Sequence, residues 1–212
     1  MKTAVVIPAF NEELRIAQVL GAVIRADCID EVLVVSDGSD DRTAEVAAMF
    51  PNVNVIDLGM NVGKGGAMWA GVQSTDAEVV VFFDADLVGL LPEHVEQMVL
   101  PMYRGADMVV GVFRHGKFWS DAAQAISPSI SGQRAVRREI LLANPSISQA
   151  RMGVEVELTR IARSQGLRLV KVELFGVTHT SKEKKFGFVE GAARRAKMYA
   201  EIGKAIVRGK RP

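Results

Sequence analysis

Short, unbroken runs of apolar residues alternate with segments of helical periodicity in the first half of the chain. The runs at 3–8, 31–36 and 79–83 carry apolar side chains at nearly every position, so the strands that they predict are buried on both faces. Buried strands separated by amphipathic helices are typical of a mostly parallel sheet with helices on both faces, an α/β fold. The predicted strands are 3–8, 31–36, 53–57, 79–83, 106–112 and 167–174. The predicted helices are 11–26, 43–50 (capped by Asp40 or Asp41), 63–74, 92–103, 153–165 and 186–207, and 131–143 reads as a turn leading into a short helix.

Length and composition limit the classes of protein to which this chain can belong. A chain of 212 residues suits one domain and buries roughly 70% of its unfolded surface. The one cysteine, Cys28, excludes an internal disulfide and fits a reducing compartment. The longest apolar run, 79–83, is far shorter than the roughly 20 residues that span a bilayer. The start of the chain runs straight into a strand rather than a leader peptide, so we expect a cytoplasmic protein.

Charge is unevenly distributed along the chain. The segment 182–212 contains ten basic and three acidic residues, whereas the rest of the chain is net acidic. We divide the chain into a half that carries the strand-and-helix alternation and is expected to bind a ligand (1–112), a second half of the same domain (113–185) and a basic amphipathic C-terminal helix (186–212). A basic helix suits peripheral contact with the inner face of a membrane or a phosphate-bearing partner, and it could equally be solvated or form a homodimer contact. We expect no nucleic-acid partner.

Polar clusters follow three of the predicted strands where each strand ends. They are Pro8–Glu12, Ser36–Ser39 and Asp84–Asp86. Ligands of open α/β sheets bind beyond the carboxyl ends of the strands, so we expect the three clusters to meet at one edge. That convergence indicates a ligand site more strongly than any one cluster does.

Asp84-Ala85-Asp86 is the expected centre of this site. Two carboxylates so close together repel unless a cation lies between them. Mg²⁺ or Mn²⁺ suits the pair because these ions prefer carboxylate and phosphate oxygens. The alternative is a pair of acidic residues at a helix N-terminus.

The cluster Ser36–Ser39 and the glycine-rich segment 59–66 suit a nucleotide. Asp37 is predicted to accept hydrogen bonds from a base or ribose, while Gly38 allows a turn with positive φ. Alternatively, this cluster is a capped turn without a ligand. The segment 59–66 departs from P-loop spacing, but Lys64 places a cation near phosphate. The glycines around it let the backbone approach a ligand or pack a helix closely: Gly63, Gly65 and Gly66.

Four motifs in the first ninety residues resemble family 2 glycosyltransferases, which have the GT-A (Rossmann-like) fold. They are 7–13, Val34-Val-Ser-Asp-Gly-Ser39, Asn61-Val-Gly-Lys-Gly65 and Phe83–Leu87. The resemblance implies a nucleoside pocket lined by Pro8, Phe10, Glu12 and Asp37, with Asn11 and Gly38 also touching substrate. It further implies that Lys64 lies near the donor, that Asp84 and Asp86 flank the metal, and that Asp84 and Ala85 also contact substrate. Ser36 departs from the family, which often has a second Asp there.

The second half resembles two branches of these enzymes. Residues 86–87, 92–95, 105–107 and 111–114 are similar to glucosyl- or mannosyl-3-phosphoglycerate synthases. Residues 131–138 and 155–158 are more similar to dolichyl- or polyprenyl-phosphate glycosyltransferases. The first branch retains and the second inverts the anomeric configuration, so the stereochemistry stays open.

The second half also supplies candidate catalytic and acceptor residues. Glu155 is predicted to act as a base or to position groups, the alternative being simple stabilisation of the helix N-terminus. Asp86 is the other predicted catalytic residue, and His179 is a predicted third metal ligand, as in the phosphoglycerate synthases. Lys182 is expected near phosphate. The expected acceptor border is Ser131, Gly132, Gln133 and Arg134.

These residues predict a metal-dependent transfer of a hexose from a nucleotide-sugar of the UDP-glucose or GDP-mannose type, to an acceptor that is phosphate-bearing or lipid-linked. A phosphoglycerate synthase-like enzyme is the nearest alternative. A sugar nucleotidyltransferase is disfavoured, because such enzymes carry a glycine-rich basic loop after the first strand and residues 8–13 contain neither glycine nor base. A binding-only relative is disfavoured by the intact acidic triplet.

Overall fold

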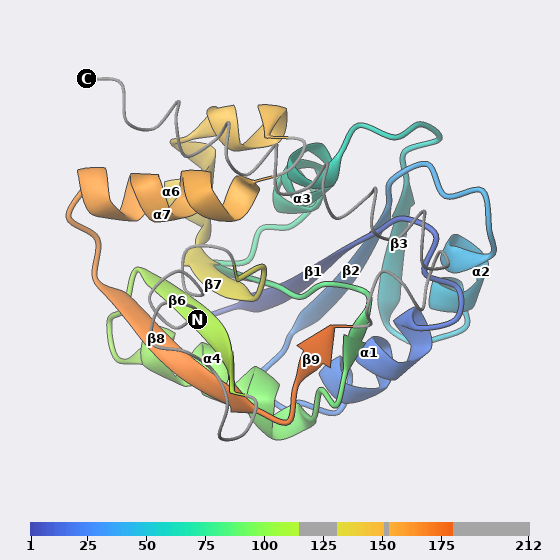
Figure 1. Ribbon diagram of the computed structural model, residues 1–212, viewed down its shortest axis with the longest axis horizontal. Helices are drawn as coiled ribbons and strands as arrows, with labels where there is room; N and C mark the ends of the chain where they lie inside the picture. Colours follow the sequence, from blue (N-terminus) through green and yellow to red (C-terminus); the bar gives the residue numbers. More distant parts are fainter. Residues whose placement is uncertain (115–130, 151–152, 180–212) are drawn as a thin grey trace.

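A seven-stranded mixed sheet forms the centre of the described part of the chain (Figure 1). The computed structural model describes residues 1–114, 131–150 and 153–179. The strands, in their order across the sheet, are β3 (Val53–Asp57), β2 (Glu31–Ser36), β1 (Thr3–Ala9), β4 (Val79–Phe82), β7 (Arg134–Arg137), β6 (Met108–Arg114) and β8 (Leu169–Phe175). The predicted α/β fold with a mostly parallel sheet is confirmed.

Strand β7 is the antiparallel member of this sheet, and the sequence did not predict it. It lies between β4 and β6, and its first residue, Arg134, pairs with Phe82 on one side and Val110 on the other. The prediction for 131–143 was a turn leading into a short helix, and the helix α6 (Arg138–Leu142) does follow. Only four residues long and carrying an arginine at each end, β7 lacks the apolar run that marked the other strands. Its position brings residues 131–133 beside the end of β4.

Helices cover both faces of the sheet and create two apolar cores (Figure 1). Helices α1 (Ile16–Val23), α2 (Thr43–Ala48) and α4 (Pro92–Tyr103) contribute to the core on one face. Helices α3 (Lys64–Gln73), α6 and α7 (Val154–Ser164), with the 3₁₀ helix η1 (Pro145–Gln149), contribute to the other. Residues that alternate along β1 divide between the two cores, Val5 and Ile7 in one and Ala4 and Val6 in the other. This two-sided burial is the physical reason why the strand is continuously apolar.

Helix α1 begins at Ile16, five residues later than predicted, because the preceding residues are tied to the β2–α2 loop. The backbone N–H groups of Asn11, Glu12 and Glu13 donate to side chains of that loop. Asn11 has a φ of 56°, a left-handed conformation incompatible with helix. In return, the N–H of Asp40 donates to Asn11 Oδ1 over 2.9 Å. Asp41 accepts the N–H of Thr43, the first residue of α2, but the N-cap position is Arg42, so neither Asp40 nor Asp41 is the N-cap that the sequence predicted.

A two-stranded antiparallel sheet lies beside the main one and was also not predicted. It pairs β5 (Leu87–Val88) with β9 (Thr178–His179), and Leu87 is opposite His179. Two-residue strands are too short to show a pattern in sequence. This pairing carries His179 across more than ninety positions of sequence to the segment that follows Asp86.

Several predictions fall outside the described residues, namely the helix over 186–207, the basic segment 186–212 and Lys182. Strands from both predicted halves, 1–112 and 113–185, belong to the main sheet. No helix in the described ranges combines the length and apolar character that crossing a membrane would require.

Candidate functional site

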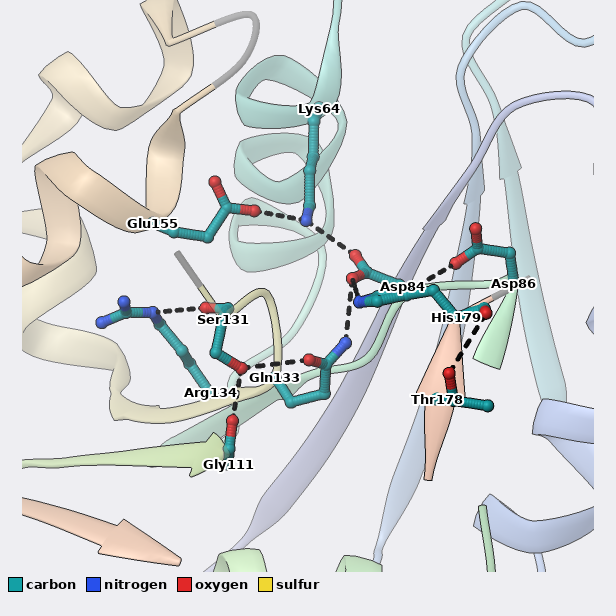
Figure 2. Close-up of polar contacts among 10 residues, drawn as sticks. All are labelled: Lys64, Asp84, Asp86, Gly111, Ser131, Gln133, Arg134, Glu155, Thr178 and His179. Carbon is teal, nitrogen blue, oxygen red and sulfur yellow. Dashed lines mark hydrogen bonds and ion pairs between the residues drawn. The ribbon is translucent and has the colours of Figure 1, made fainter. Parts of the chain in front are cut away.

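Asp84 lies two residues beyond β4 and is the centre of the polar network in Figure 2. One of its oxygens, Oδ1, lies 2.7 Å from Lys64 Nζ. The other, Oδ2, accepts a 2.8 Å hydrogen bond from Gln133 Nε2. Burial pushes the pKa of Asp84 upward, but Lys64, His179 and Gln133 outweigh it and lower the pKa to about 2. Asp84 is therefore an anion with fixed orientation at neutral pH.

Lys64 opens helix α3 and lies between two carboxylates. Its Nζ lies 2.7 Å from Asp84 Oδ1 and 2.5 Å from Glu155 Oε1 (Figure 2). Burial lowers the pKa of Lys64, but the two carboxylates outweigh that effect and raise it above the usual value. The lysine is a permanent cation between β4 and helix α7. Its predicted place near a phosphate is consistent with this charge, because a phosphate offers the same kind of acceptor.

Gln133 orients Asp84 and is itself held by its neighbours. The Gln133 side chain is fully buried, and its Oε1 accepts a 3.1 Å hydrogen bond from the hydroxyl of Ser131. The single proton of this hydroxyl is shared with the carbonyl oxygen of Gly111 on β6, which is the nearer of the two acceptors. Ser131 and Gln133 were predicted to border an acceptor. In the structure Ser131 is partly exposed, whereas the Gln133 side chain acts through Asp84.

Gly132 passes directly over the Asp84–Lys64 pair. A Cβ added to Gly132 would lie 2.5 Å from Asp84 Oδ2 and 2.7 Å from Lys64 Nζ. Only a glycine permits the backbone to approach the two charged groups so closely. A side chain at position 132 would therefore displace one or both of these charged groups, while contact of Gly132 with an acceptor stays a prediction.

Asp86 and His179 extend the site on the other side of Asp84 (Figure 2). His179 Nδ1 lies 3.2 Å from Asp86 Oδ1, and His179 Nε2 lies 3.8 Å from Asp84 Oδ2. Burial lowers the pKa of His179, but Asp86 and Asp84 outweigh it and raise the pKa above its usual value. The ring of Phe113, which the sequence did not single out, meets the imidazole edge-to-face at 4.9 Å. Phe113 is the last residue but one of β6 and pairs with Leu174 of β8, a position that only the tertiary structure reveals.

The residues Asp84, Asp86 and His179 fit a divalent metal ion. Each offers one ligand atom, and these atoms lie within 4.8 Å of one another. Two carboxylates with one imidazole are ligands that Mn²⁺ accepts, and Mg²⁺ is served by the carboxylates together with phosphate oxygens. The three residues predicted as metal ligands are thus brought together from the segment that follows β4 and from β9.

Asp37 at the end of β2 has a structural role in addition to the one predicted. Its Oδ1 accepts the N–H of Val62 over 2.7 Å, and its Oδ2 accepts the N–H of Gly63 over 3.0 Å. Asp37 thereby fixes the turn that starts α3 and carries Lys64. Gly38 has a φ of 67°, and a Cβ added to it would lie 2.5 Å from the carbonyl carbon of Met60 and 2.6 Å from the nitrogen of Asn61. The contact of either residue with a nucleoside stays a prediction.

The other residues predicted for the nucleoside pocket lie in and after β1. The Phe10 side chain is 37% exposed at the same edge of the sheet, and Pro8 is partly buried. Glu12 is mostly buried and pairs with Arg15. Asn11 is tied to the β2–α2 loop as described above. The hydrogen bonds of Asn11 and Glu12 and the ion pair of Glu12 hold this edge of the sheet in a defined shape. Contact of these residues with a nucleoside stays a prediction.

Burial and close packing decide three points that the sequence left open or predicted differently. A Cβ on Gly65 would lie 2.3 Å from the carbonyl oxygen of Ile147, and one on Gly66 would meet Val62, so of the two alternatives for these glycines the structure supports close packing of α3. The side chain of Ala85 is buried in a core, which leaves only its backbone for substrate. Arg134 was predicted to border the acceptor but is fully buried, because it points from β7 beneath helix α7.

Glu155 is the second residue of helix α7, which starts after the N-cap Gly153, whose φ is 86°. Its side chain is 12% exposed and is directed at Lys64 rather than at solvent. Glu157, two residues further on, instead binds Arg160 on the outside of the helix. The preference for Glu155 over Glu157 as the functional carboxylate therefore agrees with the directions of the two side chains. A catalytic role for Glu155 stays a prediction.

Comparison with known proteins adds an independent observation. Glucosyl-3-phosphoglycerate synthase of Mycobacterium tuberculosis is 29% identical over 153 residues, covering 66% of this chain and 47% of that protein. Undecaprenyl-phosphate 4-deoxy-4-formamido-L-arabinose transferase of Proteus mirabilis is 27% identical over 215 residues, covering 89% and 64%. The chain thus spans less than two thirds of the length of either curated relative.

A solved structure shares the fold over the whole chain. The M. tuberculosis glucosyl-3-phosphoglycerate synthase in complex with Mn²⁺, uridine diphosphate and phosphoglyceric acid superposes with a TM-score of 0.80 at 24% identity, covering 100% of this chain and 79% of that one. The GT-A fold expected from the motifs is therefore confirmed. The family profile described as "Glycosyl transferase family 2" matches residues 4–153, more than half of the chain. The chain belongs to glycosyl transferase family 2.

Proposed function

We propose that this chain is a metal-dependent glycosyltransferase that moves a hexose from a nucleotide-diphosphate sugar, of the UDP-glucose or GDP-mannose type, to an acceptor. The observation that carries the proposal is the convergence of Asp84, Asp86 and His179 beside Lys64. Carboxylates and an imidazole suit a divalent ion, and a fixed ammonium suits a diphosphate. Family membership and the likeness to a Mn²⁺ and uridine diphosphate complex support the same assignment.

The chain's own residues divide the work of the reaction. Asp84, Asp86 and His179 would hold Mg²⁺ or Mn²⁺, which when bound neutralises charge on the diphosphate leaving group. Lys64 adds a second positive charge at the edge of the same site. Gln133 keeps Asp84 Oδ2 oriented, and Gly132 leaves space for the paired charges.

Glu155 faces the interior of the site through its bond to Lys64. A carboxylate in that place can accept a proton from an acceptor hydroxyl or orient the sugar hydroxyls. An acceptor that reacts through a phosphate oxygen is already ionised, and Glu155 would then only position groups. The E155Q variant keeps the shape of the side chain and removes its charge. If Glu155 acts as a base, E155Q should impair transfer to a hydroxyl acceptor more than transfer to a phosphate acceptor, which needs no base.

The acceptor in this proposal carries a phosphate group. The P. mirabilis relative is named for undecaprenyl phosphate, and the solved M. tuberculosis structure holds phosphoglyceric acid. These acceptors differ in size and in lipid character but share an anionic phosphate. The cationic character of the residues from 182 onward, Lys182 included, is consistent with such an acceptor.

The experiment is a donor screen followed by an acceptor screen with the full-length chain. Thermal stability is measured with UDP-glucose and GDP-mannose, each with Mn²⁺, with Mg²⁺ and with a chelator, because a ligand that binds only the native state stabilises it. Release of nucleoside diphosphate is then measured with 3-phosphoglycerate and with a short-chain polyprenyl phosphate. A metal-dependent stabilisation followed by turnover supports the proposal, and no stabilisation by any nucleotide-sugar contradicts it.

The assays with the two acceptors distinguish a phosphoglycerate synthase-like enzyme from one that acts on a lipid-linked acceptor. Turnover with 3-phosphoglycerate alone favours a glucosyl-3-phosphoglycerate synthase-like enzyme, which the superposition supports. Turnover with polyprenyl phosphate alone favours the lipid-linked branch. Pyrophosphate release from a nucleoside triphosphate and a sugar phosphate would instead indicate a nucleotidyltransferase, and binding without any turnover would indicate a binding-only relative.

Peripheral membrane contact or a homodimer contact through residues 186–212 belongs to the same proposal. Ten basic residues against three acidic ones from 182 onward suit an anionic surface. Co-sedimentation of the full chain with anionic and with neutral vesicles, at low and high salt, tests membrane contact. Sedimentation velocity without vesicles tests dimer formation.

A further inference from the structure

Arg134 is a fully buried arginine located beneath the candidate site. It lies on β7, the strand that the sequence did not predict, and its side chain is among the largest that are completely enclosed. Burial is the largest influence on its pKa and lowers it to about 10, with the Glu155 carboxylate acting in the opposite direction. A buried guanidinium is costly unless its donors are satisfied, so its contacts indicate what it holds in place.

The first contact of Arg134 is with the loop that orients Asp84. Arg134 Nε donates a 3.1 Å hydrogen bond to the backbone carbonyl of Ser131 (Figure 2). The same loop contains Gly132, which passes over the Asp84–Lys64 pair, and Gln133, which donates to Asp84 Oδ2. Arg134 therefore fixes the backbone on one side of Lys64.

The second contact is with the first turns of helix α7. Arg134 Nη2 donates a 2.8 Å hydrogen bond to Thr159 Oγ1, and the Thr159 hydroxyl donates a 2.8 Å hydrogen bond to the carbonyl of Glu155. The hydroxyl thus serves as acceptor and donor in one chain of hydrogen bonds. These hydrogen bonds hold Glu155 in place, and its carboxylate binds Lys64 from the other side.

We propose that Arg134 is a positioning residue, which holds the Ser131–Gln133 loop and the Glu155-bearing turn of α7 in register so that Asp84 and Glu155 meet Lys64 from two sides. The inference rests on the proposed function for its kinetic consequences. A guanidinium suits the role because its planar fork offers donors in fixed, divergent directions. A lysine at 134 could reach one of the two segments but could not hold both with the same geometry.

The alternative is that Arg134 contributes only to the stability of the fold. A matched control is available because Arg138 lies just beyond the other end of β7. Its Nε donates a 3.0 Å hydrogen bond to the carbonyl of Val72, at the far end of α3. Arg138 is half-buried and joins two elements, as Arg134 does, but its hydrogen bonds to Val72 and Glu78 involve none of the candidate-site residues in the described part of the chain.

The experiment compares R134K, T159V and R138K with the unaltered chain. Metal-dependent turnover of the nucleotide-sugar is measured as kcat and as KM for the donor, together with thermal stability. We expect R134K to lower kcat by roughly tenfold to 100-fold, as loss of an orienting partner typically does, with a smaller change in KM. T159V should reproduce part of the loss, and the double variant R134K/T159V should lose less than the product of the two. R138K should lower thermal stability at unchanged kcat.

A second measurement does not depend on turnover. Amide hydrogen exchange of Val156 and Glu157, whose N–H groups bond to the carbonyl of Gly153, reports on the first turn of α7. R134K should speed this exchange, and R138K should leave it unchanged. If the unaltered chain turns over no nucleotide-sugar, the proposed function fails while this comparison still decides the role of Arg134. A wild-type kcat in R134K, or unchanged exchange in that turn, would overturn the positioning role.

Discussion

Lys64 Nζ lies 2.7 Å from Asp84 Oδ1, so the first of the predicted metal ligands is ion-paired with the cation predicted to lie near the donor. The same nitrogen lies 2.5 Å from Glu155 Oε1, so Lys64 links the segment after β4, which carries Asp84, to helix α7, which carries Glu155. Binding of a metal–diphosphate complex would offer Lys64 and Asp84 new partners of opposite charge. The pairing therefore defines the first experiments.

Replacement of Lys64 by Gln should remove the charge while keeping most of the side-chain length. Two carboxylates then lose a charged donor, and we expect the free energy of unfolding to fall by about 1–3 kcal/mol. Turnover should fall by roughly 100-fold or more, because a preorganised charge near the leaving group is lost. Urea unfolding and nucleoside diphosphate release provide the two measurements. Unchanged turnover in K64Q would place the lysine outside the reaction.

The metal site is tested through Asp86 and His179. D86N and H179Q should each weaken Mn²⁺ binding, on the order of tenfold or more, since each removes one of three candidate ligands. The matched control is D76N, because Asp76 is an exposed carboxylate that pairs with Lys2 at the opposite end of the sheet. Isothermal titration with Mn²⁺ in the presence of uridine diphosphate measures the affinities. Equal affinity in D86N and D76N would contradict the assignment.

A methyl group at position 132 should disrupt the site without unfolding the chain. The added Cβ of G132A meets Asp84 Oδ2 at 2.5 Å and Lys64 Nζ at 2.7 Å, so the paired charges must separate. We expect turnover to fall by roughly 100-fold, the scale expected for a misplacement of about 1 Å. The control is G21A in helix α1, where a Cβ meets nothing within 4 Å. G21A should leave turnover unchanged and stabilise the chain by about 0.5–1 kcal/mol.

The role of Asp37 is tested by D37N, which replaces one of the two oxygens that accept the N–H groups of Val62 and Gly63. Loss of a charged acceptor for buried backbone donors should lower the free energy of unfolding by about 1–3 kcal/mol. If anchoring is the main role, turnover falls together with stability while the affinity for uridine diphosphate changes by less than roughly tenfold. A larger loss of nucleotide affinity at nearly unchanged stability would show direct contact with the nucleoside.

His94 should make stability depend on pH well away from the site. Its Nδ1 accepts the backbone N–H of Leu91 at the start of α4, which requires the unprotonated nitrogen. Burial lowers the pKa of His94 below the ordinary 6.5, against opposing effects from Glu93 and the carbonyl of Phe175. The unfolded chain then binds more protons below pH 6.5, so this contribution to stability is complete above pH 6.5 and is lost as the pH falls.

Two variants separate the charge of His94 from its cap. H94Q can still accept the Leu91 N–H, as Gln does at this position of a capping box, but it does not titrate. Its thermal stability should therefore fall less than that of the unaltered chain between pH 7 and pH 5. H94L should lose the cap at every pH, at a cost of about 1 kcal/mol. A parallel pH dependence in H94Q and the unaltered chain would rule out this histidine as its source.

The strands and helices of the first half were predictable because burial requires apolar residues at regular positions within each segment. The ranges 31–36, 53–57 and 92–103 agree with the structure at both ends, since apolar periodicity and turn residues act over a few positions. The start of α1 was predicted five residues early for the opposite reason. A tie between Asn11 and the β2–α2 loop, nearly thirty positions away in sequence, decides that boundary.

The acidic triplet, Lys64 and the order of the motifs are properties of the sequence alone, and they sufficed to indicate a nucleotide-sugar site. Three relationships needed the tertiary structure. These are the pairing of β5 with β9 that brings His179 to Asp86, the insertion of β7 that places Gly132 over Asp84, and the burial of Arg134 beneath α7. Each depends on contacts between segments far apart in the chain. Such contacts form only when the complete sheet packs against its two cores. Short strands and buried charges therefore have no local sequence pattern that predicts them.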